Sequence, residues 1–415
     1  MRTVNYSEVL QLVCEQAGLT YADAMNETLL RLRGHISRRF RLIWEADYWP
    51  ELTRLEERRY RLPWAAGTTY AAGDEVFYLG NVRPVNDYFQ ALRALPLTVS
   101  SLTRASTTAT ATTSAAHGLT TGDLVTVTGA NQTEYNVTAA VTVLSTTQFY
   151  YSILGTPTTP ATGTIRATPN PVNDSGTVNA GNWYPCQGSY SANNWAASTT
   201  YSLGNVVRYG ATGRYYVCIA ANTGQLPSNT TYFSPLTPFD QYVGYTQTGQ
   251  TAIGEVREVY SNNPRVSKGY YTTPFTLSAN GVQCTTGPSV VWLEFRTRFV
   301  PLTGSDYDAT ATYAVGDQIL FNSSGSVKNF YTCVTATSAG ESPDSAAAKW
   351  SVVEIPYLFQ PYLVMGAYAD YLRMDGQQDK ASVQDKLADE YLQAERVKLW
   401  DAQPQQSLIS MTTAY

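Results

Sequence analysis

The sequence contains one short phrase three times: TTYAAGDEV at 68–76, TTYSLGNVV at 199–207 and ATYAVGDQI at 311–319. In each copy a tyrosine stands three residues before a glycine, and Asp or Asn follows that glycine. Gly-Asp and Gly-Asn are turn signals, and the apolar residues after them favour a strand. The phrase therefore predicts the same turn, leading into a strand, at three separate places in the chain.

The second and third copies extend into units of about 40 residues. Each has an aromatic opener, the phrase, a strand with an aromatic-x-Cys motif, a Gly–Pro loop and a closing aromatic residue. A unit of this size buries little surface, so its large aromatic residues must supply most of the core. The residues concerned are Trp195, Tyr216, Cys218 and Phe233 in the second copy, and Tyr307, Tyr331, Cys333 and Trp350 in the third.

The first copy begins with Trp64 but loses its ending. The missing part is found again in NPVNDSGTVNAGNWYPC, with Trp183 as the closing aromatic residue. The intervening segment 105–168 alternates apolar and polar residues between glycines, which is typical of a small β domain. One hypothesis is that this domain is inserted into the first unit; the alternative is that 64–90 and 170–186 belong to separate domains.

Both ends of the chain are helical in pattern. A capping box of Asn5 and Glu8 begins a first helix, which Gly18 ends, and a second helix is expected over 22–45. Two more are expected between Pro356 and Gly376 and over 381–400, the last with Val383, Leu387, Tyr391 and Ala394 on its packed face.

The predicted fold class is therefore α+β and multidomain: a helical bundle from both chain termini, a central β region and several small all-β inserted modules. The expected divisions are 1–62 and 355–415 for the helical scaffold, 241–302 for the central β region, 63–104 with 169–189, 190–240 and 303–354 for the three repeats, and 105–168 for the inserted β domain.

Composition and motifs argue against several function classes. Charged residues make up 15% of the chain and the net charge is −5, which disfavours a protein that binds nucleic acid over a broad surface. There are two histidines, His35 and His117, and no nucleophile elbow, phosphate loop or Cys-x-x-Cys motif. We expect no enzyme, no cofactor and no metal site, and we expect the five cysteines to be small buried residues. For His117 and Asp123, turn capping is favoured over a metal or catalytic pair.

Arginines are concentrated between residues 31 and 61, which hold about a third of the chain's 28 basic residues. Arginine forms bidentate contacts with carboxylates and phosphates, so this stretch suits docking to an acidic protein or to DNA. Intramolecular pairing with nearby glutamates is the open alternative. The candidate partner-facing residues are Arg38, Arg39 and Arg41.

The motif Trp…Tyr-x-x-Gly-Asp…Tyr-x-Cys…Gly…Pro…Trp resembles the small carbohydrate-binding modules attached to bacterial chitinases and cellulases. Those modules stack exposed aromatic rings on sugars. The resemblance implies carbohydrate-binding roles for Trp64, Trp183, Trp195, Tyr232, Tyr307 and Trp350, unless these rings form the cores of the modules. The stretch HGLTTGDLVTVTGA, in the segment 105–168, resembles a small β domain of tail and fibre proteins of tailed phages.

The layout of 1–62, 240–300 and 355–402 resembles a head-to-tail adaptor (connector) protein of tailed bacteriophages. The resemblance implies a structural virion protein at the head–tail junction, in a dodecameric ring around the genomic DNA. Its terminal helices would dock on the portal protein, and its β elements would face the next tail component, a nozzle or a tail terminator or stopper. The minimal adaptor is shorter and lacks the repeats. Here they would point outward, and a ring would multiply weak contacts with tail fibres or cell-surface glycans.

Two other functions stay open. A receptor-binding or tail-fibre-type protein would carry such modules, but helices at both ends favour a compact scaffold. A secreted polysaccharide-degrading enzyme would need a signal peptide and a catalytic motif. The first residues lack a signal-peptide pattern and the chain has no apolar run of transmembrane length, so assembly in the host bacterial cytoplasm is expected.

Overall fold

The computed structural model describes residues 2–21, 25–79, 88–247, 249–267, 269, 271–284, 290–323 and 328–402, with side chains as far as 399. The fold is mixed α+β: mostly strands in several small sheets, with four α-helices among the described residues. The chain divides into two compact units. Unit 1 comprises Met1–Leu55, Ala252–Arg257 and Glu294–Tyr415, and unit 2 comprises Glu56–Thr251 and Glu258–Leu293.

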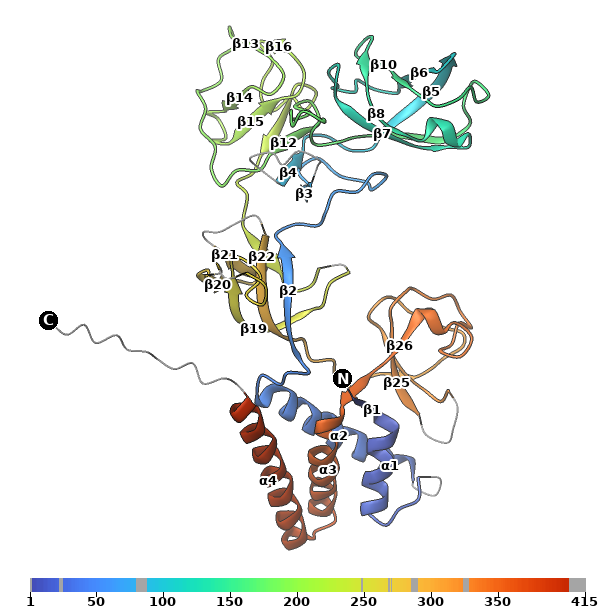
Figure 1. Cartoon of the computed structure of the whole chain (residues 1–415), viewed down its shortest axis with the longest axis vertical. Coiled ribbons are helices and arrows are strands. Elements are labelled where there is room, and N and C mark those ends of the chain that lie inside the picture. Colours follow the sequence, from blue (N-terminus) through green and yellow to red (C-terminus); the bar gives the residue numbers. More distant parts are fainter. Residues whose placement is uncertain are drawn as a thin grey trace, which may run out of the picture. The chain divides into compact units, whose positions relative to one another are not determined.

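The four helices all belong to unit 1 (Figure 1). Helix α3 packs against each of the other three. The core that they enclose also takes residues from strands, among them Phe330 and Ile355. The two ends of the chain therefore meet as predicted, but the bundle is seen only in part because β elements complete its core. The helices are α1 (Tyr6–Gln16), α2 (Asn26–Ala46), α3 (Gln360–Met374) and α4 (Gln378–Ala402).

The helix ends predicted at Asn5, Gly18 and Gly376 are present, whereas α2 begins at Asn26, later than predicted, and residues 22–24 of the predicted start lie outside the described residues. The Glu8 carboxylate accepts a hydrogen bond from Asn5 N at 3.5 Å, which caps α1. Gly18 and Gly376, with φ of +67° and +78°, follow α1 and α3 and adopt a conformation that few other residues tolerate. At the very start of the chain β1 (Thr3–Asn5) pairs with β27 (Glu354–Pro356), which ties the N-terminus to the segment that leads into α3.

The packed face predicted for α4 is wrong at three of its four residues: Val383, Leu387 and Ala394 are exposed, whereas Tyr391 is partly buried against the helical core as predicted. Val383 and Leu387 are 60% and 43% exposed, and the buried residues of this helix are Ala381, Ala388 and Leu399. The face of α4 that contacts α3 is formed by the small residues Ala381 and Ala388, which let the two helices approach closely. It also contains the half-buried Asp385, and that charged residue is the reason why an apolar pattern selected the opposite face.

The third repeat lies in unit 1 beside the helices. Its sheet has the order β23-β24-β25-β26, with β23 parallel to β24. The Phe330 ring packs on Tyr6 at 4.9 Å, and the Asn329 side chain accepts a hydrogen bond from Ser7 N at 2.8 Å. The helical core and this repeat therefore share a boundary. The strands are β23 (Ser305–Asp306), β24 (Gln318–Phe321), β25 (Asn329–Cys333) and β26 (Trp350–Val352).

The first two repeats lie in unit 2, each with an antiparallel three-stranded sheet. The first has the order β12-β4-β3, from β3 (Glu75–Phe77), β4 (Tyr88–Ala91) and β12 (Trp183–Pro185). Trp183 pairs with Ala91 across that sheet, a pairing that an interrupted first unit requires. The second has the order β14-β15-β17, from β14 (Val206–Arg208), β15 (Tyr215–Cys218) and β17 (Phe233–Leu236), with β13 (Thr200–Tyr201) paired to β16 (Asn222–Thr223).

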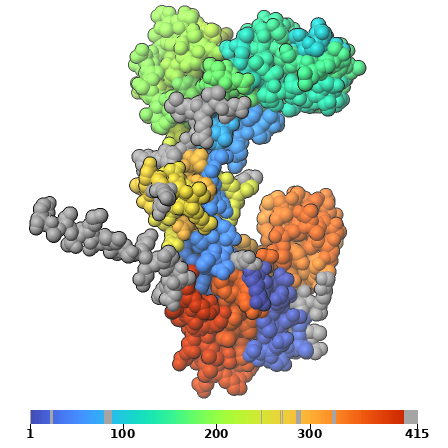
Figure 2. Space-filling view, in the orientation of Figure 1, coloured from blue at the N-terminus to red at the C-terminus, as the bar shows by residue number. Residues whose placement is uncertain are grey.

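The segment between β4 and β12 forms a nearly closed seven-stranded barrel in the order β8-β7-β11-β5-β6-β10-β9. Its apolar core is continuous with that of the first repeat. Arg93 links the neighbours, donating to carbonyl oxygens of Ala116 in the barrel, Gly181 in the first repeat and Ile219 in the second. Figure 2 shows the barrel in teal beside the second repeat in light green. The strands are β5 (Leu97–Ala105), β6 (Thr108–Thr113), β7 (Leu124–Ala130), β8 (Thr138–Ala140), β9 (Thr142–Val143), β10 (Gln148–Ser152) and β11 (Gly163–Pro169).

The central region is built of strands, as predicted. Two small sheets have the orders β19-β22-β2 and β18-β21-β20. Among the described residues, no helix combines the length and the apolar character needed to cross a membrane. The strands are β2 (Thr53–Arg59), β18 (Tyr242–Gly244), β19 (Ile253–Tyr260), β20 (Phe275–Leu277), β21 (Gly281–Cys284) and β22 (Val290–Thr297).

Candidate functional site

Each repeat begins with the same local structure. In the first repeat the Tyr70 hydroxyl accepts a hydrogen bond from Ala65 N at 2.8 Å and donates one to Ala65 O at 3.2 Å. The tyrosine of the phrase therefore holds the residue that follows the aromatic opener. The same pair of bonds joins Tyr201 to Ala196 at 2.8 and 3.3 Å, and Tyr313 to Asp308 at 2.8 and 3.2 Å.

The Gly-Asp or Gly-Asn pair closes the turn in all three copies. The side chain of Asp74, Asn205 or Asp317 accepts a hydrogen bond from the backbone N–H three residues earlier, at 2.7, 2.8 and 2.7 Å. The preceding glycines have φ of +98°, +83° and +98°, which explains why glycine is used there. Asp123 of the barrel makes the same bond to Thr120 N at 2.7 Å after Gly122, so the turn occurs a fourth time without the tyrosine.

Two pairs of aromatic rings recur in the repeats. The tyrosine of the phrase packs edge-on against the closing aromatic ring in every copy. The distances between ring centroids are 5.5 Å for Tyr70–Trp183, 5.8 Å for Tyr201–Phe233 and 5.3 Å for Tyr313–Trp350. Trp183 thus holds in the first repeat the place of Phe233 and Trp350 in the others. The opener meets a second ring in the same manner: Trp64–Tyr78 at 5.4 Å, Trp195–Tyr209 at 6.1 Å and Tyr307–Phe321 at 5.3 Å.

These pairs correct part of the predicted sugar-binding set. Trp183 is completely buried and Trp350 is 7% exposed, so neither offers a ring face to a sugar, because both rings form the cores of their repeats. The other four candidates, Trp64, Trp195, Tyr232 and Tyr307, are half-buried. The indole nitrogens of Trp64 and Trp195 and the Tyr307 hydroxyl are turned inward, without a hydrogen-bond partner among the described residues.

The arginine-rich helix α2 holds a buried ion-pair cluster. Arg39 binds Asp370 of α3 through Nε at 3.0 Å and Nη2 at 2.8 Å, and it binds Asp385 of α4 at 2.8 Å. Arg373 contacts both carboxylates. Burial opposes ionisation of Asp370, but hydrogen bonds from Arg39 and Arg38 outweigh it and hold the pKa at about 2. This cluster joins α2, α3 and α4.

The three arginines predicted to face a partner are therefore not equivalent. Arg39 is 7% exposed and binds Asp370 and Asp385 inside unit 1, so its prediction as a partner contact is wrong. The Arg38 side chain is 60% exposed although one nitrogen lies 2.6 Å from Asp370. The Arg41 side chain is 67% exposed, and its one ion pair within the described residues is with Glu45, which is 47% exposed, at 3.0 Å. Intramolecular pairing also accounts for Arg31, Arg58, Arg59 and Arg61, which bind Glu27, Glu56, Glu57 and Glu75.

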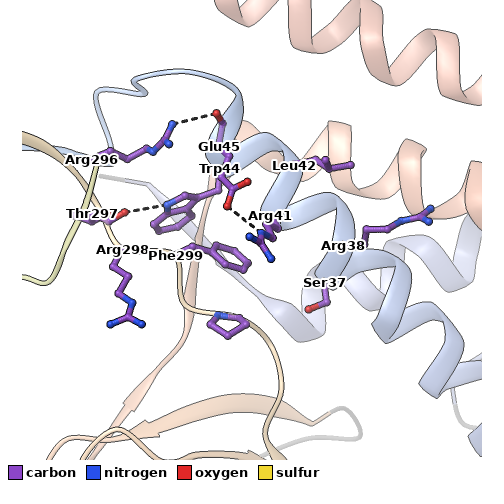
Figure 3. A pocket seen from close by; sticks show the side chains of 12 residues that line it. Ser37, Arg38, Arg41, Leu42, Trp44, Glu45, Arg296, Thr297, Arg298 and Phe299 are labelled. Carbon is purple, nitrogen blue, oxygen red and sulfur yellow. Dashed lines mark hydrogen bonds and ion pairs between the residues drawn. The ribbon is translucent and has the colours of Figure 1, made fainter. Parts of the chain in front are cut away.

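Arg38 and Arg41 line a cavity of about 780 Å³ in unit 1, together with Arg296 and Arg298. Figure 3 shows Arg41 beside the rings of Trp44 and Phe299, Arg296 and Arg298 on the other side of the rings, and Arg38 on α2 with its side chain pointing away from them. The Trp44 indole donates a hydrogen bond to Thr297 O at 3.1 Å, which joins α2 to the end of β22. The Arg296 guanidinium donates to the carbonyl oxygens of Glu45 and Asp47 at 3.2 Å each. We refer to this cavity as the arginine pocket.

The remaining predictions concern chemistry. His117 caps a turn as expected: its Nδ1 accepts a hydrogen bond from Leu119 N at 2.9 Å, and its Nε2 lies 2.9 Å from Ser145 O. All five cysteines are buried, as predicted, and all are free thiols. Within the described part of the chain, no group of three or more His, Cys, Asp or Glu residues is placed to hold a metal ion.

Sequence reasoning missed four residues of these sites: Asp370, Asp385, Arg296 and Arg298. Asp370 interrupts the apolar run YLVMGAYA, and a charge within such a run is a usable signal for a buried ion pair. Arg296 and Arg298 alternate with Phe295, Thr297 and Phe299, but nothing in the sequence brings them to α2. That juxtaposition depends on the tertiary fold.

Comparison of the chain with known protein families, with curated protein sequences and with solved structures found no significant match.

Proposed function

We propose that this chain is a structural virion protein, a head-to-tail adaptor that joins the portal protein of a tailed bacteriophage to the next tail component. The observation that carries the proposal is the shared core of unit 1. There α1 and α2 pack with α3 and α4 although some 300 residues separate the two pairs in the sequence. An adaptor with additions has this plan, in which a scaffold closed by both termini carries inserted modules.

The partners follow from that role. We propose that the chain forms a dodecameric ring on the portal protein, with its helices on the portal, its β elements on the nozzle or the tail terminator or stopper, and genomic DNA in the channel. It would assemble in the host bacterial cytoplasm and reside at the head–tail junction. The proposed role is structural and involves neither an enzymatic step nor a cofactor.

The test is the native mass of the purified full chain, alone and after mixing with the candidate portal protein. We expect a monomer that assembles into a ring when the portal is added, because the portal supplies the symmetric template. A stable trimer that ignores the portal would contradict the adaptor proposal and would favour a tail fibre. The portal mixed with a carrier protein of similar mass is the control.

The second candidate function is carbohydrate binding by the repeats, as in a receptor-binding or fibre-type tail protein. It is favoured by one observation, that Trp195, Tyr232 and Tyr307 keep part of their surface exposed. Sedimentation of the chain with insoluble chitin and cellulose tests it. We expect loss of binding in Trp195→Ala with Tyr307→Ala, and no change in Tyr271→Ala, an exposed tyrosine outside the repeats.

A further inference from the structure

We propose that the arginine pocket of unit 1 binds an acidic peptide segment of a partner protein, in which carboxylates neighbour an apolar side chain. The pocket lies between α2 and the end of β22. This inference concerns a ligand class and does not require the adaptor role, so each proposal can fail without the other.

The charge of the pocket points to an anionic ligand. Four arginines and one glutamate line it, and one of the four, Arg296, is already paired with Glu255 and bound to backbone carbonyl oxygens. Arg298 is exposed and forms no ion pair within the described residues. The Arg41–Glu45 pair is a solvent-exposed pair on one turn of helix, a kind that stabilises a helix only weakly, so Arg41 can exchange Glu45 for a better partner.

Arg38 adds donors to the same surface. Its carboxylate partner, Asp370, also accepts bonds from Arg39 and Arg373, so one acceptor is shared by three guanidinium groups. With its side chain 60% exposed, Arg38 retains N–H groups that face solvent. A guanidinium binds a carboxylate through two parallel hydrogen bonds, which makes carboxylates the natural ligands for these three arginines.

The shape and the walls favour a peptide over nucleic acid. A cavity of about 780 Å³ accommodates a few side chains, whereas a duplex needs an extended basic surface. The Trp44 ring is 8% exposed, and the Phe299 ring packs edge-on against Phe40 and Trp44 at 5.2 and 5.6 Å. These rings are engaged in the core and provide an apolar wall. They do not provide the free flat face that base stacking requires.

The experiment uses the full chain and fluorescence anisotropy of three labelled probes. These are a short peptide of alternating Glu, Leu and Phe, the same peptide with Gln in place of Glu, and a thymidylate oligonucleotide. The test variant is Arg41→Gln with Arg298→Gln. The matched control is Arg31→Gln with Arg214→Gln, two exposed arginines outside the pocket that give the same change in net charge.

We expect the Glu peptide to bind, and to bind at least about tenfold more weakly to the test variant and within about twofold to the control. Added salt should weaken binding, and the Gln peptide should not bind. Thermal unfolding verifies that the variants are folded, and Arg298→Gln alone replaces the double variant if that one is unstable.

Three results would overturn the proposal. Equal binding of the Glu peptide to the wild type and to the test variant would remove the pocket as its site. Tighter, variant-sensitive binding of the oligonucleotide would assign the pocket to phosphates. Sedimentation showing an oligomer of the chain alone, abolished in the test variant, would make a second copy of the chain the occupant.

Discussion

The helical part of unit 1 and the three repeats are stabilised in different ways. In the helical part, the carboxylate of Asp370 is 2% exposed beneath guanidinium groups from two helices. In each repeat, the recurring contacts are a tyrosine hydroxyl bonded to the backbone, two pairs of aromatic rings and a turn closed by an Asp or Asn side chain, and none of them is an ion pair. One chain therefore contains a part stabilised by buried ion pairs and parts stabilised by aromatic contacts. The stability of the first should depend on pH, and that of the others should depend on local packing and hydrogen bonds.

The largest decrease in the free energy of unfolding is expected for Asp370→Asn. The substitution leaves Arg38, Arg39 and Arg373 with one carboxylate fewer, and loss of one partner from a buried ion pair costs about 3–5 kcal/mol. Urea unfolding followed by the helical circular dichroism signal measures the change, because the helices of the described chain lie in unit 1. Asp389→Asn, at an exposed position on α4, is the control. A change of similar size in both variants would show that the cluster does not stabilise the helices.

Acid should destabilise the helices next most strongly. The folded-state pKa of Asp370 is about 2, below the ordinary value of 3.8, so its contribution is complete above about pH 4 and disappears as the pH falls towards 2. The shift corresponds to about 2 kcal/mol. Asp385 changes in the same direction: its burial is outweighed by hydrogen bonds from Arg373 and Arg39, which lower its pKa. Burial lowers the pKa of His35 below its ordinary value of 6.5, so its share of the stability is lost earlier, as the pH falls below 6.5.

Urea unfolding at a series of pH values measures this dependence. The wild type should lose helical stability steeply below pH 4, and Asp370→Asn should show a flatter profile over the same range. Parallel profiles for the two proteins would mean that other groups cause the acid sensitivity.

The same contrast explains what the sequence made predictable. The turn and the burial of the cysteines follow from residue types and local spacing, and the assignment of Trp183 to the first repeat follows from comparison with the other two copies; the structure contains all three. Arg39 and Asp370 are 331 positions apart, so no local pattern links them. The packed face of α4 was missed for a related reason. Its contact stripe contains Asp385, and only knowledge of Arg39 makes a carboxylate acceptable there.

Replacing the turn glycine of each repeat by alanine tests whether the turn contributes equally to the stability of the three repeats. Gly73, Gly204 and Gly316 all have positive φ; an added Cβ would meet nothing within 4 Å at Gly73 or Gly316, and at Gly204 it would lie 3.4 Å from the Ala180 Cβ, an ordinary van der Waals contact. The cost is then backbone strain alone, about 1–2 kcal/mol for each substitution. Hydrogen exchange of peptides from each repeat measures the local change, with Gly210→Ala, at a glycine of ordinary φ and open surroundings, as the control. If the protection from exchange fell by clearly different amounts in the three repeats, the shared turn would not stabilise them to the same extent.

The smallest decrease in stability is expected when the tyrosine of each phrase is replaced by phenylalanine. Tyr70→Phe, Tyr201→Phe and Tyr313→Phe keep the ring contacts and remove only the two bonds of the hydroxyl. Because the bonded residues Ala65, Ala196 and Asp308 are exposed, water replaces the lost partner, and we expect about 1 kcal/mol or less. The amide hydrogens of those three residues should exchange faster in the corresponding variant, whereas Tyr271→Phe, at a tyrosine that is 70% exposed, should leave them unchanged. Unchanged exchange in all three variants would mean that the aromatic pairs alone hold the opener in place. The hydroxyl bonds, although present three times, would then contribute nothing to the stability of the repeats.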